Sequence, residues 1–190
     1  MNFRPKRIKL AAGTIGALAA ATLAVSTSPA AASGTYSGLD YVYGAAGWSD
    51  DWDNEGVVDI NTNASSNATC LWQKVLWADG YLSSSADIDG IFGSRTKTAT
   101  ANWQSDSGVG VDGSAGRDTW SLAAIATISY VSGGDATAAD MTLKYSGWNA
   151  RTHTWTGRNF TMKRDASGNY HFIDGDGAWR KAGYNYRSCS

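Results

Sequence analysis

Side chains suited to acid–base or metal chemistry are few in this chain of 190 residues. Glu55 is the only glutamate, and His153 and His171 are the only histidines. Glycosidases use a pair of carboxylates, and zinc hydrolases typically use three protein ligands with histidine prominent. His153, His171 and Asp174 are a conceivable set of zinc ligands. The spacing of His171 and Asp174, however, would put them on opposite faces of a strand. The sequence therefore predicts no catalytic residues, no metal site and no cofactor.

Cys70 and Cys189 are the only cysteines, and so the only candidates for a thiol nucleophile. In an exported protein an even number of cysteines indicates a disulfide, and two cysteines allow one intramolecular pairing. We therefore predict a Cys70–Cys189 bond, which would staple the C-terminal segment onto the region around Cys70 and make one compact body of the two. The alternative is two unrelated thiols, one of them used for dimerisation.

Two further motifs bear on functional chemistry. IDGDGAW, residues 173–179, begins like a calcium loop but lacks the later Asp and Glu ligands of a full site. We expect a plain turn there. The Gly-x-Ser-x-Gly motif of serine hydrolases does not occur in the chain.

One loop pattern, Asp-Gly-x-x-Gly-x-x-Thr, occurs twice, from Asp89 to Thr96 and from Asp112 to Thr119. Asp-Gly makes a tight turn, because Asp accepts bonds from the amides that follow it and Gly adopts a φ that other residues resist. The second Gly lets the loop close onto a helix, and the Thr packs in the first turns of that helix. The repeat predicts two similar loop-into-helix units packed against one opening helix.

Apolar residues at helical spacing support three helices between residues 68 and 129. The first, in ATCLWQKVLWADGYL, should end at Asp79-Gly80. Ser94 is expected to cap the second, and Gly108 to end it. The third opens at Arg117 and is expected to bury Trp120, Leu122 or Ala123, and Ile125.

Residues 68–126 closely resemble the peptidoglycan-binding domain of bacterial cell-wall hydrolases and other secreted proteins. Trp replaces the family's aliphatic residue before Gln73 and its Phe before Gln104. Asp79 stands where the family often has an apolar residue, Ser94 where Pro is common, and Ala115 where the first loop has Phe92. The blocks that match in order and spacing are Trp72-Gln73, Gly80-Tyr81, Asp89-Gly90-Ile91-Phe92-Gly93 with Thr96, Trp103-Gln104, Asp112-Gly113, and Gly116 with Thr119-Trp120.

The resemblance implies binding of a glycan-peptide polymer in a shallow groove beside the first Asp-Gly loop and the second helix. Phe92 would lay its ring against a sugar. The alternative is that Phe92, Trp103 and Trp120 belong to the core and that Asp89 and Asp112 only brace turns. The implied ligand-binding residues are Asp89, Gly90, Phe92, Gly93, Arg95, Thr96 and Gln104, with Lys97 and Asn102 as further polar groups.

The C-terminal region alternates in side-chain character over residues 141–145, 159–164 and 169–174, which predicts half-buried strands. RDASGN predicts a hairpin turn with Gly168 at positive φ. Short strands are expected at residues 41–43 and 57–60. The predicted fold class is α+β, a small three-helix bundle plus a C-terminal antiparallel β meander. Aromatic residues left open as core or as a second ligand face are Trp148, Trp155, Trp179, Tyr184 and Tyr186.

Residues 1–32 have the basic start, apolar run and small residues of a secretory signal peptide, with cleavage expected after Ala32. The apolar run is shorter than the roughly 20 residues that span a bilayer. Cleavage removes four of the 16 basic residues and leaves 12 against 17 acidic ones, which argues against nucleic acid as a partner. The remainder is expected to be a monomer without membrane contact, divided into a loop-rich acidic segment at 33–67, a helical domain at 68–129 and a β module at 130–190.

The sequence therefore favours a secreted, cell-wall-associated protein that binds peptidoglycan without catalysis. Two other classes remain. One is a cell-wall hydrolase with an unrecognised site in the C-terminal module. The other is a secreted inhibitor or toxin-like effector that uses the helical domain as a tether to the wall.

Overall fold

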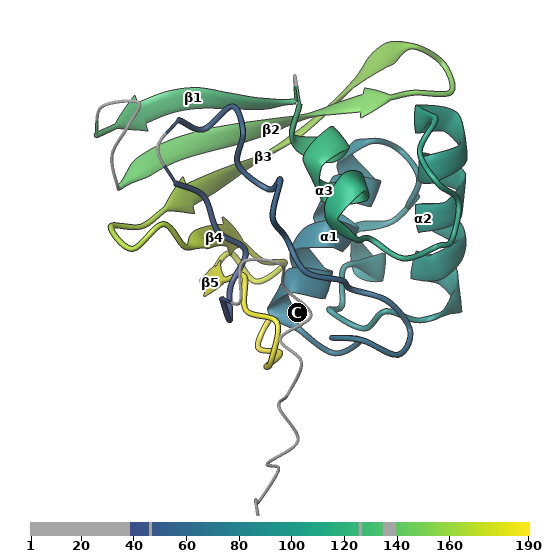
Figure 1. Ribbon diagram of the computed structural model, residues 1–190, viewed down its shortest axis with the longest axis horizontal. Coiled ribbons are helices and arrows are strands. Elements are labelled where there is room, and N and C mark those ends of the chain that lie inside the picture. The colour runs from purple at the N-terminus through teal and green to yellow at the C-terminus, as the bar shows by residue number, and fades with distance from the viewer. Residues whose placement is uncertain (1–38, 46, 126, 135–139) are drawn as a thin grey trace, which may run out of the picture. The chain divides into compact units, whose positions relative to one another are not determined.

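The computed structural model describes residues 39–45, 47–125, 127–134 and 140–190. The predicted signal peptide, residues 1–32, lies outside them. The described residues form three α-helices, one short 3-10 helix and one five-stranded antiparallel sheet (Figure 1). This arrangement confirms the predicted α+β fold class.

Helix α1, Asn67–Ala78, lies at the centre of the fold and is buried on nearly every side. It contacts α2 on one side and strands β2 and β3 on the other, as Figure 1 shows. Ser66 caps its N-terminus, because the Ser66 side chain accepts a 3.0 Å hydrogen bond from the Thr69 amide. The helix ends at Asp79, as the sequence predicted. Lys74 is the only charged residue of this helix, which suits its central position.

Helices α2, Ser94–Ser107, and α3, Arg117–Ala124, each follow one Asp-Gly loop. The expectation that Ser94 caps α2 is wrong, because Ser94 is already helical and Gly93 is the N-cap residue, without a side-chain bond. Gly108 ends α2 as predicted. Trp120 and Ala123 are buried, whereas Ile125 is 56% exposed, because the chain turns extended at that residue and leaves the helix.

The sheet has the strand order β1-β2-β3-β4-β5, a meander in which each strand pairs with the next. The predicted strands are confirmed as β2 (Met141–Asn149), β3 (Thr154–Arg164) and β4 (Tyr170–Ile173). Gly168, in the β3–β4 turn, has the predicted positive φ of 84°. Strands β1 (Ile128–Gly133) and β5 (Trp179–Lys181) were not predicted. In β1 only the first residue is buried, so its sequence carries no alternation.

The segment before α1 contributes isolated bridges, not the two short strands expected at 41–43 and 57–60. Tyr41 pairs with Gly183, Tyr43 with Asn169, and Val58 with Ala115. These single pairings attach the segment to the C-terminal region and to the second Asp-Gly loop.

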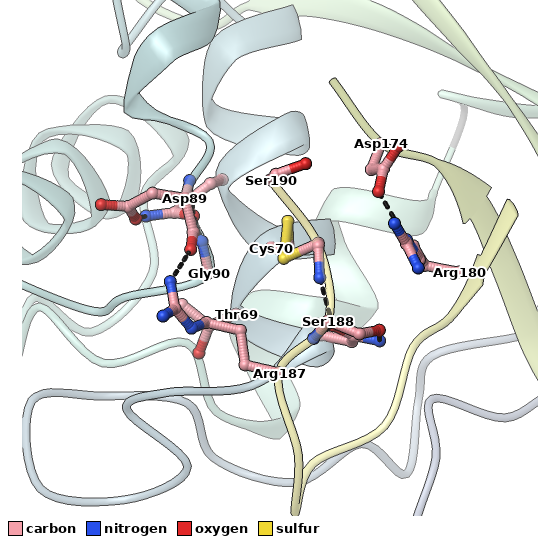
Figure 2. Close-up of a disulfide and its surroundings, with 12 residues drawn as sticks. Thr69, Cys70, Asp89, Gly90, Asp174, Arg180, Arg187, Ser188 and Ser190 are labelled. Atoms are coloured by element: carbon pink, nitrogen blue, oxygen red, sulfur yellow. Dashed lines mark hydrogen bonds and ion pairs between the residues drawn. A yellow bond between two sulfur atoms is a disulfide. The ribbon is translucent and has the colours of Figure 1, made fainter. Parts of the chain in front are cut away.

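The helices and the sheet share one aromatic core. The Trp52 ring lies 5.3 Å from Trp120 of α3 and 5.5 Å from Tyr170 of β4, both edge-on, and 6.3 Å from Tyr145 of β2, stacked. The predicted disulfide between Cys70 and Cys189 is present (Figure 2). Together these contacts confirm that the C-terminal part folds back onto the helical part as one compact body.

Candidate functional site

Gln73, on α1, organises the first Asp-Gly loop. Its side-chain oxygen accepts from the amides of Asp89 (3.0 Å) and Gly90 (2.7 Å). Its side-chain nitrogen donates to Asp89 Oδ1 (2.9 Å), to the Ile91 carbonyl (3.1 Å) and to Thr96 Oγ1 (3.0 Å). One buried amide therefore closes the loop and ties it to the first turn of α2.

Gln104, on α2, makes the same set of bonds to the second loop. Its oxygen accepts from the amides of Asp112 (3.2 Å) and Gly113 (2.8 Å). Its nitrogen donates to Asp112 Oδ1 (2.9 Å), the Ser114 carbonyl (2.9 Å) and Thr119 Oγ1 (3.1 Å). The two Asp-Gly loops are thus organised alike, each by a Gln on the preceding helix.

The C-terminal tail lies against the first loop, as Figure 2 shows. The Arg187 guanidinium donates a 2.9 Å hydrogen bond to the Asp89 carbonyl. A Cβ at position 90 would lie 2.7 Å from Cys189 Sγ, and Gly90 has a φ of 70°, so the loop needs glycine there for both reasons. The disulfide therefore holds the tail directly beside the first Asp-Gly loop.

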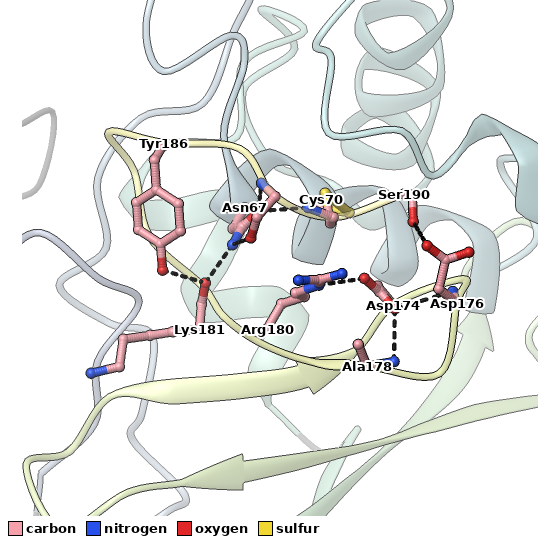
Figure 3. Close-up of polar contacts among 11 residues, drawn as sticks. Asn67, Cys70, Asp174, Asp176, Ala178, Arg180, Lys181, Tyr186 and Ser190 are labelled. Carbon is pink, nitrogen blue, oxygen red and sulfur yellow. Dashed lines mark hydrogen bonds and ion pairs between the residues drawn. A yellow bond between two sulfur atoms is a disulfide. The ribbon is translucent and has the colours of Figure 1, made fainter.

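Asn67, at the start of α1, fastens the same tail from the other side (Figure 3). Its side-chain oxygen accepts from the amides of Ser188 (2.8 Å) and Cys189 (3.1 Å), and its nitrogen donates to the Lys181 carbonyl (2.9 Å). The tail is thus fixed by backbone and side-chain bonds as well as by the disulfide.

The predicted ligand-binding residues fall into a buried and an accessible group. Gly90, Phe92, Thr96 and Gln104 are buried. The Phe92 side chain is 1% exposed and packs in the core, so the expectation that its ring faces a sugar is wrong. Gln104 belongs to the second loop and not to the first. Asp89 and Arg95 are exposed and Gly93 is half-buried, so these three can meet a ligand directly.

Two hollows flank the first loop. The first, of ≈ 280 Å³, lies over the start of α2. The Arg95 side chain at its rim is 75% exposed and forms an ion pair with Asp87. The second, of ≈ 670 Å³, lies between the loop and the tail and includes Arg187 and Asp176. Residues lining the first hollow are Gln73, Ala86, Asp87, Asp89, Ile91, Gly93, Ser94, Arg95 and Thr96.

The second Asp-Gly loop also borders a hollow, of ≈ 800 Å³, which includes Val57 and Asp59 from the segment before α1. Arg117 at its edge donates a 2.8 Å bond to the Asp53 carbonyl. The loop-rich segment therefore shapes the surroundings of the second loop, as the tail shapes those of the first.

Three of the residues considered for catalysis, Glu55, His171 and Asp174, have structural partners. Glu55 is buried and accepts from the Tyr43 amide (2.8 Å) and the Tyr184 hydroxyl (2.6 Å). His171 Nε2 lies 2.9 Å from Asp165 Oδ2. In the β4–β5 turn, Asp174 accepts from the Ala178 amide (2.9 Å) and pairs with Arg180 (Figure 3). Within the described ranges, no three His, Cys, Asp or Glu side chains are placed to hold a metal ion.

Comparison with protein families shows what the helical region is similar to. A family model described as a putative peptidoglycan binding domain matches residues 65–122. This range contains α1, α2, both Asp-Gly loops and most of α3. The match therefore supports a peptidoglycan-binding domain in this part of the chain. Searches of curated proteins and of solved structures found no match.

Sequence reasoning missed two features of the site. The first is the role of Gln73 in organising the loop, which was not predicted. A Gln nevertheless precedes each Asp-Gly loop directly after a Trp. That repeated Trp-Gln pair was the available signal. The contribution of Arg187 had no such signal, because the residue lies 98 positions after Asp89 in the chain.

Proposed function

We propose that the protein is a secreted, non-catalytic protein that binds peptidoglycan at the first Asp-Gly loop. The observation that carries this proposal is the pair of Gln-organised loops within the matched residues 65–122. At the first of them, the exposed groups of Asp89 and Arg95 border a hollow of ≈ 280 Å³.

The chemistry of these hollows suits a glycan-peptide polymer. Such a ligand presents hydroxyls, amides and carboxylates, which pair with charged and polar side chains and with backbone groups. Arg95 and Arg187 offer donors on the two sides of the loop, and Asp87, Asp89 and Asp176 offer acceptors. A rigid loop keeps these groups in place before binding, which lowers the entropy cost of association.

The absence of catalysis is proposed from the state of the chain's candidate residues. The sole glutamate, Glu55, is 1% exposed and its carboxylate is hydrogen-bonded on both oxygens. His171 is engaged with Asp165, and Asp174 with Arg180. Hydrolysis of a glycosidic bond commonly needs a pair of carboxylates. The two carboxylates beside the first loop are those of Asp87 and Asp89, and Asp87 is already paired with Arg95.

Secretion is proposed from the signal-like residues 1–32 and is consistent with the disulfide, which oxidising compartments favour. Among the described residues no helix is both long and apolar enough to span a bilayer.

Co-sedimentation with purified insoluble peptidoglycan tests the binding. The full chain should pellet with the wall material. Arg95→Ala should weaken binding about fivefold, the equivalent of about 1 kcal/mol for one charged hydrogen bond. Lys144→Ala, which removes an exposed positive charge on β2, is the matched control and should bind like the parent. Protein that stays in the supernatant would refute the proposal.

Turnover of the same material separates this function from a hydrolase. We expect no release of soluble sugar or peptide during prolonged incubation. Clear release that disappears on changing His153, His171 or Asp174 would show that the alternative, a cell-wall hydrolase, is correct. Inhibition of a wall-degrading enzyme by the protein would instead support the tethered inhibitor.

A further inference from the structure

A separate cleft of ≈ 430 Å³ lies where the end of α2 and the end of α3 meet the β2–β3 hairpin. Five of its 13 lining residues come from the β2–β3 hairpin, outside the residues that match the family model. Its volume falls within the range typical of small-ligand sites. Its lining includes Asp79 at the end of α1, Trp103 of α2, Leu122 of α3, and Trp148, His153 and Trp155 of the hairpin.

The floor of the cleft is organised by Asp79, which is 2% exposed. Its Oδ2 accepts from Trp103 Nε1 (2.7 Å) and from the Tyr145 hydroxyl (3.0 Å), and its Oδ1 accepts from the Trp148 amide (2.9 Å). One buried carboxylate therefore joins α1, α2 and β2. These bonds fix the floor of the cleft.

The hairpin that forms the outer wall is also fixed. Thr156 Oγ1 donates to the Ala78 carbonyl (2.6 Å), and Asn149 Nδ2 donates to the Asp79 carbonyl (2.8 Å). Arg151 Nε donates to Asp106 Oδ2 (2.9 Å) across the rim. These three contacts join the hairpin to the end of α1 and to α2. They hold the aromatic residues of the hairpin in place beside the cleft.

Trp148 and Trp155 are cross-strand partners on this hairpin. Their ring centroids lie 5.2 Å apart in an edge-to-face arrangement. Trp155 is 58% exposed, an unusual state for so large an apolar ring. The pair therefore presents an indole surface beside the cleft.

The rim carries polar groups without partners. In the part of the chain that the structure describes, the side chains of Ser107 and His153 and the indole N–H groups of Trp148 and Trp155 make no hydrogen bond. A purely apolar ligand would bury these groups without hydrogen-bond partners, which disfavours binding. The matching ligand has an apolar face and a ring of hydrogen-bonding groups.

We propose that this cleft binds a saccharide ring that carries an N-acetyl group, with the ring against Trp155. A pyranose has apolar C–H faces that suit an indole, and hydroxyls at its edge that suit the unpartnered donors and acceptors. The acetamido methyl suits the apolar wall of Leu122, Ala123 and Ile125. The site uses the sheet and not the first Asp-Gly loop, so its location is separate from that of the proposed wall binding.

A titration of the full chain with the soluble β-1,4-linked tetramer of N-acetylglucosamine tests this proposal. NMR should show a saturable shift of the Trp155 indole N–H signal. Trp155→Ala should weaken binding of the tetramer by about tenfold or more, as loss of a central aromatic contact does. Trp179→Ala is the matched control, because Trp179 is 39% exposed on β5 and outside the cleft, and it should bind like the parent.

Three results would overturn the proposal. They are no saturable shift at all, equal weakening by Trp179→Ala, and shifts confined to residues 85–96. Equal affinity for a glucose tetramer would overturn the requirement for the N-acetyl group. Because the tetramer carries no peptide, a protein that fails to sediment with peptidoglycan but binds the tetramer at Trp155 would refute only the proposed wall binding by the first loop.

Discussion

Trp103 Nε1 donates a 2.7 Å hydrogen bond to the buried carboxylate of Asp79, at the point where α1 ends beside α2. Both residues depart from the pattern of the peptidoglycan-binding family. The same carboxylate accepts from Tyr145 and from the Trp148 amide of the sheet. The two departures therefore meet in one contact, which joins the helical region to the C-terminal sheet.

Trp103→Phe, which restores the residue common in the family, should destabilise the protein by about 1–3 kcal/mol, because one hydrogen bond to a buried carboxylate is lost. Trp72→Phe is the matched control. It removes the 2.9 Å bond from Trp72 Nε1 to the neutral hydroxyl of Thr100 inside the helical domain. Hydrogen exchange should show faster opening of β2 near Trp148 only in Trp103→Phe. Equal exchange in the two variants would contradict the coupling.

Gln73→Ala and Gln104→Ala should each lower stability by about 1–3 kcal/mol, because each leaves two loop amides without their acceptor. Their effects on binding should differ. Gln73→Ala loosens the first loop and should weaken co-sedimentation with peptidoglycan, whereas Gln104→Ala loosens the second loop and should leave it unchanged. Loss of binding only in Gln104→Ala would assign the ligand to the second loop.

Cys189→Ser should lower the melting temperature. The disulfide links residues 119 positions apart, and closing so long a loop stabilises by roughly 4–5 kcal/mol in the chain-entropy model. Limited proteolysis should then release the tail after Lys181. Thiol labelling of the denatured, non-reduced parent should find no free cysteine. Two free thiols or a linked dimer would contradict the bond.

Stability should fall as the pH rises from about 5 to 8. Burial raises the pKa of Asp79 and that of Glu55 each to about 7, against the opposing effect of their hydrogen bonds. Burial also raises the pKa of Asp51, to about 6, although Asp51 pairs with Arg164 at 2.7 Å. Asp79 and Glu55 have no cationic partner among the described residues. Between roughly pH 4 and 7 the folded state therefore holds protons that the unfolded state has released.

Melting temperatures at pH 5 and pH 8 check this prediction, and the value at pH 5 should be higher. In Asp79→Asn combined with Glu55→Gln the difference should shrink, even though the variant is less stable, because neither side chain titrates. A melting temperature of the parent that rises from pH 5 to pH 8 would show that these carboxylates are ionised in the folded state throughout.

Much of the fold could be predicted because its signals are local. Alternation revealed β2, β3 and β4, and the Asp-Gly pattern revealed both loops. Strand β1 was not predicted, because only its first residue is buried and its side chains show no alternation between buried and exposed positions. Ile125 was misplaced because helical spacing was extended one residue beyond the end of α3.

For the candidate site, the sequence by itself determined the repeated loop, its exposed Asp89 and Arg95, and the disulfide, since two cysteines permit one intramolecular pairing. Only the tertiary structure decided that Phe92 lies in the core and that Arg187 binds the Asp89 carbonyl. It also decided that Trp103, Trp148 and Trp155 border one cleft. The physical reason is the range of the interactions. Turns and strands depend on neighbouring residues, whereas burial and these contacts depend on side chains brought together from distant parts of the chain.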